Sequence, residues 1–463
     1  MSTLIAVSAL GIVCLLLDIF NLRKILIPFT LLALIAILGM SVAEFTSGES
    51  FIEPDKYNMI VTSAFAQGFS ILFIILAILI IAMTPKFYEE KIVKIADYVA
   101  LKVFMLAGAV AMVSFGNLAM FFIGLEVLSI CAYALASSEP KDIRSNEAGM
   151  KYFLMGAFAS SFIIFGIALI YGATGSLDIA EVTSSSISQG ESLPVWFYIG
   201  FVMISVGMMF KASIAPFHFW APDVYEGSPT LVTAIMSTLV KVAAIGTLFK
   251  LITILAVGLT PAYQVILIVL SILTMSIGNV TALKQKNIKR MMAYSGISHA
   301  GFMMMTFLAI ETSANAVLYY AAAYSFAGIA AFAVILAVCK GKEDEKIEHF
   351  YGLIKRDPLL TAVLIGAFLS LSGIPIFAGF FAKFFVFEQM LQANHIVLVV
   401  FGVINSVIAA YYYFGIGNVM ITKESASDAP LKAPFEYKIV ALVAISLTIL
   451  LGIVPSVIMG LSL

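Results

Sequence analysis

The chain has 463 residues, of which 62% are hydrophobic and 11% are charged. Soluble domains are about 45–50% apolar and about 25% charged, so this composition excludes an ordinary soluble enzyme and a disordered protein. The formal net charge of −1 leaves no basic surplus for binding nucleic acid, and the chain is expected to be a polytopic membrane protein.

Apolar stretches long enough to cross the hydrocarbon layer as helices, about 20 residues each, follow one another along the chain. Fourteen are expected, at 2–20, 25–43, 61–83, 99–115, 117–136, 148–171, 194–218, 229–254, 259–283, 291–310, 314–339, 358–388, 395–421 and 437–459. The first lacks a basic segment before it and a cleavage site after it, which favours a retained anchor helix over a signal peptide. No intervening stretch is long enough for a soluble domain. The sequence therefore predicts an all-α transmembrane helix bundle forming one membrane domain, 1–463.

The basic residues of the loops are distributed unevenly between the two sides of this bundle. Nineteen Lys and Arg residues lie in alternate loops, and the opposite set of loops contains one, Lys56. Loops rich in Lys and Arg face the cytoplasm. Because the number of spans is even, both termini are predicted on the outer side. A bacterial cytoplasmic membrane, with both termini in the periplasm, is the expected location because the chain has no targeting presequence.

The sequence contains none of the common cofactor motifs. Cys14, Cys131 and Cys339 lie far apart within apolar stretches, and no CxxC pair exists that would hold zinc or an iron–sulfur cluster. GxGxxG and GxxxxGK[ST] are also absent, so no nucleotide site is expected. The sequence predicts no cofactor and no metal in this chain.

Several ionisable residues lie inside the apolar stretches, where a charge costs about 2.5–3.5 kcal/mol on insertion scales. They are Lys102, Lys151, Lys211, Lys241, Lys250, Lys383, Glu126, His218 and His299. Lys102 and Lys250 lie near the ends of their spans and are expected to snorkel toward the interface. Tyr411, Tyr412 and Tyr413, near the inner end of another span, are expected to act as interface anchors.

The deeper lysines leave two interpretations open. The first interpretation is that they form structural ion pairs, for example Glu126 with Lys211. However, Lys211, Lys241 and Lys383 share a single mid-span acid, so pairing within the chain does not balance their charges. The second interpretation is a proton relay, because burial disfavours the charged form of a lysine and a nearby carboxylate favours it. Lysine ammonium groups do not coordinate metal, so a metal site is a poor interpretation of this pattern.

Two of the expected spans contain helix breakers. Pro216 follows Lys211 in the seventh span, and Pro375 precedes Lys383 in the twelfth. Both belong to S-x-x-P motifs, which are 159 residues apart. Broken helices at matching places in two halves are typical of secondary transporters. Five spans per repeat would make successive repeats inverted in the membrane, although a simple kink at each proline would also explain the pattern.

Three segments resemble a known family: KASIAPFHFWAPDVYEGSPT, NEAGMKYFLMGAFASSFIIFGIALIYGATGS and NIKRMMAYSGISHAGFM. They are similar to the subunit N family of proton-pumping NADH:quinone oxidoreductase (complex I). More widely, they resemble the antiporter-like membrane subunits of complex I and of multi-subunit sodium/proton antiporters. The resemblance extends over essentially the whole chain.

This resemblance implies two inverted five-helix repeats, at 99–254 and 259–421, with three peripheral spans before them and the span 437–459 after them. It implies proton-transfer roles for seven residues, namely Glu126, Lys151, Lys211, His218, Lys241, His299 and Lys383. Protons would enter from the cytoplasm toward Lys211 and Lys241, pass along a lateral hydrated link and leave through Lys383, with Glu126 modulating Lys211 or facing a neighbouring subunit.

The resemblance also implies that the chain is a non-redox subunit of a translocase. NADH, FMN, iron–sulfur clusters and quinone would then reside in partner subunits of the respiratory chain complex, and other antiporter-like subunits would pack alongside in the lipid bilayer. Two alternatives remain open. One is a component of a multi-subunit sodium/proton antiporter, and the other is a structural scaffold whose lysines are merely paired.

Overall fold

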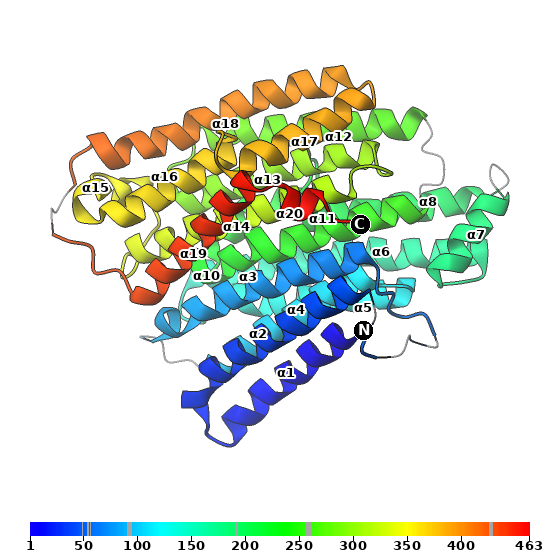
Figure 1. The fold of residues 1–463 in the computed structure, drawn as a ribbon, viewed down its shortest axis with the longest axis horizontal. Helices are drawn as coiled ribbons and strands as arrows, with labels where there is room; N and C mark the ends of the chain where they lie inside the picture. Colours follow the sequence, from blue (N-terminus) through cyan, green and yellow to red (C-terminus); the bar gives the residue numbers. More distant parts are fainter. Residues whose placement is uncertain are drawn as a thin grey trace.

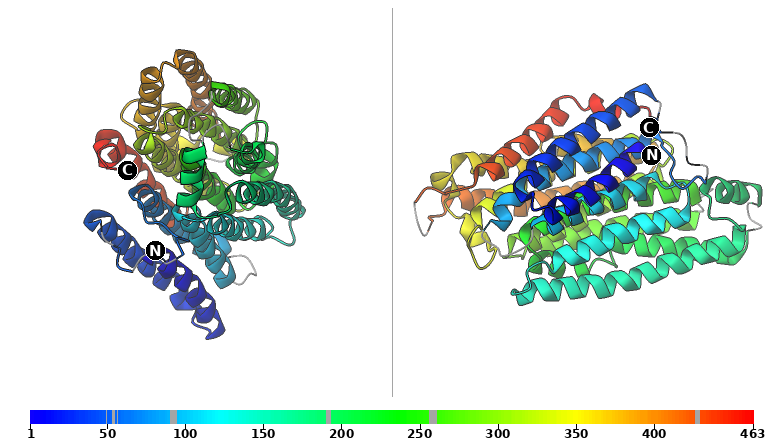
Figure 2. Two further views of the ribbon diagram at one scale, coloured as in Figure 1. Left: turned by 90° about the vertical axis from the view of Figure 1, so that its right-hand side faces the viewer. Right: turned by 90° about the horizontal axis from the view of Figure 1, so that it is seen from below.

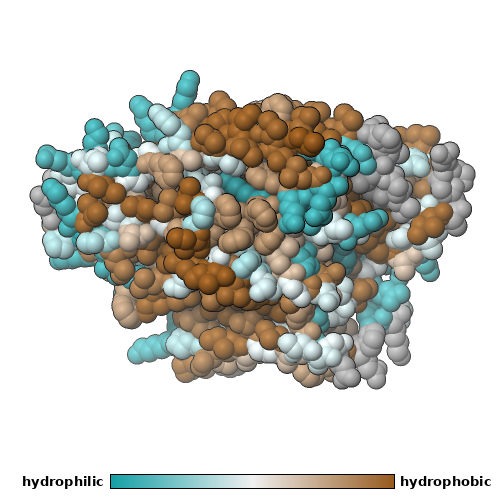
Figure 3. Space-filling view, turned by 45° about the horizontal axis from the view of Figure 1, so that its top comes forward, coloured by the Kyte–Doolittle hydropathy of each residue, from teal (hydrophilic) through white to brown (hydrophobic). Residues whose placement is uncertain are grey.

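The computed structural model describes the chain except for residues 49, 53–54, 56, 90–94, 190–192, 256–260 and 426–428. Lys56 and the first residues of the stretch expected at 259–283 therefore lie outside the described part. The described residues form a bundle of helices that run roughly side by side (Figure 1). Large apolar areas cover the face seen in Figure 3, while hydrophilic residues are prominent at its left-hand end.

The observed helices follow the expected spans in chain order. The first half contains α1 (Ser2–Ile19), α2 (Arg23–Ser47), α3 (Ala64–Tyr88), α4 (Ile95–Ser114), α5 (Leu118–Ala136), α6 (Ile143–Thr174), the short α7 (Ile179–Gln189), α8 (Val195–Ala212), α9 (Trp220–Gly227), α10 (Thr230–Ile235), the π-helix η2 (Met236–Val240) and α11 (Lys241–Leu255). The second half contains α12 (Pro261–Ala282), α13 (Ile288–Met305), the 3₁₀ helix η3 (Thr306–Leu308), α14 (Ala314–Val338), the 3₁₀ helix η4 (Ile347–Phe350), α15 (Leu353–Arg356), α16 (Pro358–Ser372), α17 (Ala378–Gln392), α18 (Ile396–Thr422), α19 (Phe435–Ile453) and α20 (Ser456–Met459).

Each of the fourteen expected stretches is helical, and the all-α fold is confirmed. Twelve helices in the described part are long and apolar enough to cross a membrane. The other two expected spans fail that criterion for different physical reasons. α13 carries Lys289, Arg290 and His299 among its 18 residues, and the twelfth span is divided into α16 and α17, of 15 residues each.

The loops predicted to be basic come together at one end of the bundle. Lys86, Arg144, Lys289 and Lys340, from four different loops or helix ends, line a common pocket there. The two chain termini lie at the opposite end (Figures 1 and 2). There the amino group of Met1 donates a hydrogen bond to Thr62 Oγ1 at 3.1 Å. These basic residues and the two termini therefore lie at opposite ends of the bundle, as the Lys and Arg distribution predicts, while the membrane side of each end stays a prediction.

The two expected helix breaks are present and share one backbone pattern. Ser213 caps the C-terminus of α8, and Gly373 caps that of α16; both residues adopt the left-handed conformation, with φ of 60° and 88°. In each case the next residue, Ile214 or Ile374, donates its N–H to a carbonyl of the last helical turn. These helix ends are 160 residues apart. The 159-residue offset of the S-x-x-P motifs is therefore wrong by one, and Pro216 corresponds to Ile376 rather than to Pro375.

The two halves of the chain also share a close contact between two helices, α4 with α5 in the first half and α12 with α13 in the second. A Cβ atom added to Gly108 on α4 would lie 2.6 Å from the backbone N of Leu128 on α5. A Cβ atom added to Gly278 on α12 would lie 2.6 Å from the backbone N of Ser298 on α13. Both helix pairs thus approach closely at a glycine where a larger residue would clash. The two halves thus share this close approach, and the division into repeats at 99–254 and 259–421 stays a prediction.

Candidate functional site

Lys211 lies in the last turn of α8, next to the first helix break. Its side chain is buried, and Nζ donates a 2.7 Å hydrogen bond to Ser129 Oγ on α5. The rings of Tyr133 and Tyr152 lie 5.2 and 5.1 Å from Nζ, within cation–π range. The environment of this lysine therefore consists of a hydroxyl and two aromatic rings.

Glu126 lies one turn before Ser129 on α5 and is half-buried. Its carboxylate accepts a hydrogen bond from Ser160 Oγ on α6. The ion pairs within the described part of the chain do not include one between Glu126 and Lys211, so the structural pair considered for these two residues is wrong. Glu126 instead shares α5 with Ser129, the hydrogen-bond partner of Lys211, whereas Lys211 itself lies on α8.

Lys241 is the first residue of α11 and directly follows the π-helix η2. Only 1% of it is exposed, and within the described part of the chain Nζ has no hydrogen-bond partner. The ring of Tyr225 lies 5.8 Å from Nζ. A Cβ atom added to Gly296 on α13 would lie 3.0 Å from this Nζ and 2.8 Å from the hydroxyl of Tyr324. Gly296 thus leaves open the space between the two polar groups.

His299 lies in the interior of α13, surrounded by tyrosines. Its Nδ1 lies 2.9 Å from the hydroxyl of Tyr320, and its Nε2 lies 3.4 Å from the hydroxyl of Tyr413. His299, Tyr320 and Tyr324 also line a small cavity in which about 10 Å³ is open to the centre of a water molecule. That space is about enough for one water.

The three consecutive tyrosines of α18 separate by environment. Tyr413 and Tyr412 are buried, and the hydroxyl of Tyr412 donates to Asn279 Oδ1 at 3.1 Å. Tyr411 is 75% exposed. The prediction of interface anchors is therefore wrong for Tyr412 and Tyr413, because successive helical residues point in directions about 100° apart and only one of the three faces outward.

Lys383 lies on α17, immediately after the second helix break. It is buried, and Nζ donates a 2.9 Å hydrogen bond to the carbonyl of Ser372, the last residue of α16. The ring of Phe302 lies 5.0 Å from Nζ. The C-terminus of a helix has exposed carbonyls and a negative dipole end, so the break itself supplies a partner for the ammonium group.

Lys151 differs from these three lysines. Its side chain is 43% exposed, and Nζ forms ion pairs with Glu147 at 2.7 Å and Asp223 at 3.2 Å. Asp223 also binds Arg290 at 2.7 Å. Lys151 is therefore part of an accessible network of ion pairs.

His218 occupies the turn between α8 and α9 and is 4% exposed. Its ring packs on that of Phe219, with centroids 4.4 Å apart. In the described part of the chain, Nδ1 lacks a hydrogen-bond partner. His218 thus lies inside the first helix break, beside the backbone of Pro216.

The two lysines near span ends do not behave alike. Lys102 is 4% exposed and donates to Thr84 Oγ1 at 3.1 Å, so the prediction that it snorkels is wrong. Lys250 is half-buried and donates to the carbonyls of Val113 and Phe115 at 2.9 and 2.7 Å, just beyond the end of α4. Lys250 therefore satisfies backbone carbonyls where that helix ends.

Sequence reasoning missed the hydroxyl groups that accompany the buried ionisable residues. These are Ser129 next to Lys211, Tyr320 and Tyr413 next to His299, and Tyr324 near Lys241. One signal was available for Ser129, which follows Glu126 by three residues and so shares a helix face with it. The tyrosines come from α14 and α18, and no spacing in the sequence relates them to α13.

Comparison with known proteins places the chain in a family. The family model described as "NADH:quinone oxidoreductase/Mrp antiporter, TM" matches residues 116–409. A protein of Flavobacterium johnsoniae named NADH-quinone oxidoreductase subunit N is 54% identical, and the alignment covers 100% of both chains. A protein of the same name from Cytophaga hutchinsonii is 37% identical over 99% of both chains. The chain belongs to the subunit N family.

Solved structures agree with this placement. A chain in the structure of respiratory complex I from Thermus thermophilus with bound aureothin superposes with a TM-score of 0.84 at 30% identity, covering 99% of this chain and 98% of that chain. A chain of the Mrp complex from Dietzia superposes with a TM-score of 0.88 at 20% identity, covering 99% and 95%. The second similarity concerns the fold alone. The chain is thus a multi-pass membrane protein with the fold of the antiporter-like subunits, and the resemblance noted in its sequence is confirmed.

Proposed function

We propose that this chain translocates protons as a non-redox membrane subunit of NADH:quinone oxidoreductase, driven by electron transfer in other subunits. Its family membership and its full-length similarity to a chain of a respiratory complex I structure support the assignment. The expected partners are other membrane subunits of that complex, including neighbouring antiporter-like subunits.

One observation carries the proposal: Lys211, Lys241 and Lys383 are each at most 5% exposed, and within the described residues none of them has an ion-pair partner. A buried charge without a counter-ion is strongly destabilised, so a permanent charge on all three would be costly. Groups with this environment are suited to bind a proton and release it again. A scaffold held by paired lysines would instead place a carboxylate beside each ammonium group.

The route we propose begins at the basic end of the bundle, reaches Lys211 and Lys241, and continues past His299 to Lys383. The hydroxyls around His299 and the cavity beside it supply hydrogen-bonding groups between the two halves. We place the basic end in the cytoplasm of a bacterium and both termini in the periplasm, because Lys- and Arg-rich loops face the cytoplasm. Glu126 acts on the charge of Lys211 through space.

Replacing Lys211 by Met in the assembled enzyme tests the proposal. Proton pumping and NADH oxidation coupled to it should fall at least about tenfold, since Met has similar length and no ionisable group. Lys250→Met is the matched control, because Lys250 binds backbone carbonyls at a helix end. It should leave the number of protons pumped per electron unchanged. Normal pumping by an assembled Lys211→Met enzyme would refute the role of Lys211. Sodium-dependent transport in the absence of NADH would favour the sodium/proton antiporter instead.

A further inference from the structure

A pocket of about 370 Å³ opens at the basic end of the bundle. Its walls come from segments that are far apart in the sequence, between the end of α3 and the start of α19. Charged residues of both signs line it, including Lys86, Asp142, Arg144, Glu226, Lys340 and Glu343. Such a lining holds water, so the pocket brings the aqueous phase into the end of the bundle.

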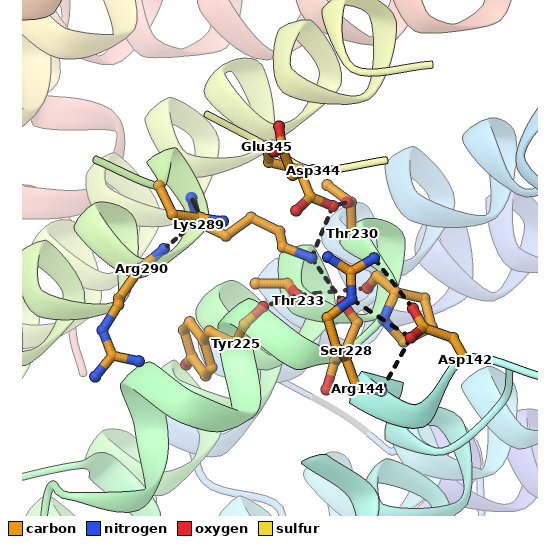
Figure 4. A network of polar contacts seen from close by, with 12 residues as sticks. Asp142, Arg144, Tyr225, Ser228, Thr230, Thr233, Lys289, Arg290, Asp344 and Glu345 are labelled. Carbon is orange, nitrogen blue, oxygen red and sulfur yellow. Dashed lines mark hydrogen bonds and ion pairs between the residues drawn. The ribbon is translucent and has the colours of Figure 1, made fainter. Parts of the chain in front are cut away.

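An ion pair forms the inner wall of this pocket. Lys289 Nζ lies 2.9 Å from Glu345 Oε1 and donates a 2.8 Å hydrogen bond to the carbonyl of Ser228. Thr230 Oγ1 donates to the same carboxylate oxygen at 3.0 Å. Figure 4 shows these side chains converging above the start of α10. Lys289 is 2% exposed, so the pair separates the pocket from the interior of the protein.

A polar stripe continues inward from the ion pair along one helix. Thr230, Thr233, Ser237 and Lys241 follow one another across α10, η2 and α11 at intervals of three, four and four residues, which is close to one helical turn each. From Thr230 to Lys241 the stripe spans about 16 Å at 1.5 Å per residue. Thr233, Ser237 and Lys241 are each at most 1% exposed, and the Ser237 hydroxyl lies 3.1 Å from that of Tyr324. The stripe thus ends at the buried lysine whose Nζ has no partner among the described residues.

We propose that this pocket is the mouth of the proton inlet to Lys241 and that the Lys289–Glu345 ion pair is its gate. The inference rests on the proposed function. While the pair is formed, it separates this stripe of hydroxyls from the pocket. When Glu345 withdraws, Thr230 loses its acceptor and water from the pocket reaches Thr233. The loop that carries Glu345 connects α14 to η4, so movement of that loop controls the gate.

Cysteine accessibility tests the gate directly in the purified, assembled enzyme. The native cysteines Cys14, Cys131 and Cys339 are first replaced by Ser. Thr233→Cys then reports on the stripe behind the gate, and the probe is 2-aminoethyl methanethiosulfonate. Glu345→Ala should make this site react at least about tenfold faster, because it leaves the buried ammonium of Lys289 without its counter-ion and so destabilises the closed arrangement.

Glu343→Ala is the matched control, since Glu343 carries the same charge on the same loop and lines the same pocket. It should leave the labelling rate at Thr233→Cys unchanged. Thr247→Cys, fully buried farther along α11, should stay unreactive with either substitution. Equal acceleration by Glu343→Ala, or none by Glu345→Ala, would overturn the gate. If Thr233→Cys prevents assembly, Ser237→Cys serves as the reporter.

This measurement separates the gate from the proposed function, because labelling does not depend on pumping. A Lys211→Met enzyme that loses pumping, together with unchanged labelling in Glu345→Ala, would keep the function and overturn the gate. Accelerated labelling together with normal pumping by Lys211→Met would overturn the proton-transfer role of Lys211 and support only water access through the pocket.

Discussion

Ser129→Ala isolates the hydroxyl that holds Lys211. Ser129 Oγ accepts the 2.7 Å hydrogen bond from Lys211 Nζ, and no carboxylate in the described part of the chain forms an ion pair with this lysine. A hydrogen bond to a charged group contributes about 1.5–3 kcal/mol, which corresponds to a factor of about 10 to 150 in an equilibrium constant. The nearby tyrosine rings remain in the variant, so they stabilise the ammonium group of Lys211 to a similar extent with or without the Ser129 hydroxyl. The charged form of Lys211 should therefore become about 10 to 150 times less populated relative to its neutral form.

Proton pumping by the assembled Ser129→Ala enzyme should consequently fall about tenfold or more. Ser129→Thr keeps the hydroxyl and should retain most of the pumping. Ser325→Ala is the matched control, because Ser325 is also fully buried and its hydroxyl has no partner among the described residues. Pumping is measured as acidification of inverted membrane vesicles during NADH oxidation. Wild-type pumping by Ser129→Ala, or equal losses in Ser129→Thr and Ser129→Ala, would refute the reasoning.

Three further predictions follow from other contacts. Lys383→Arg keeps the positive charge but cannot release its proton, so an assembled variant should lose pumping; unchanged pumping would show that Lys383 does not titrate. Asp357 caps α16 through the N–H of Leu360 and pairs with Lys438 at 2.7 Å. Asp357→Ala should destabilise the protein by about 0.5–2 kcal/mol, seen as aggregation at lower temperature, and a larger effect of Lys438→Ala would contradict this. Partial burial at the wall of the pocket, reinforced by the nearby carboxylate of Glu345, raises the pKa of the Cys339 thiol to about 12. Alkylation by iodoacetamide at pH 8 should therefore be roughly a thousandfold slower than for an ordinary thiol and should accelerate about tenfold per pH unit, whereas a rate near that of a free thiol would refute the raised pKa.

The spans were predictable because lipid imposes simple conditions on sequence. Apolar stretches of the required length and the uneven distribution of Lys and Arg located all fourteen helical regions, including α13, whose polar residues lower its hydropathy. Pro216 and Pro375 located both helix breaks. Their alignment was off by one residue because the backbone turns at Ser213 and Gly373, and not at the prolines.

The immediate partners of the lysines were not predictable, because they depend on how helices pack. Lys102 lies near a span end, which predicts that it snorkels toward the interface. Its hydrogen bond to Thr84 on α3 instead keeps the ammonium group inside the bundle. The π-helix η2 changes the direction in which the residues after it point, including Lys241. No motif in the sequence predicts this π-helix. The run of three tyrosines near a span end predicts an interface anchor at Tyr413, and only tertiary structure places this residue beside His299.

The buried lysines share a chemical feature that bears on how a proton moves between them. Lys211 binds a serine hydroxyl, Lys383 binds a backbone carbonyl, and Lys241 has no partner in the described part of the chain. A carboxylate at any of these places would stabilise the ammonium form strongly in a medium of low dielectric constant, and loss of the proton would leave an unpaired buried anion. A hydroxyl or a carbonyl stabilises the ammonium only modestly and remains neutral when the proton leaves. In the proposed mechanism both charge states of the lysine are then accessible, and Glu126, which accepts a hydrogen bond from Ser160 and forms no ion pair with Lys211 among the described residues, would shift the balance between them without fixing it.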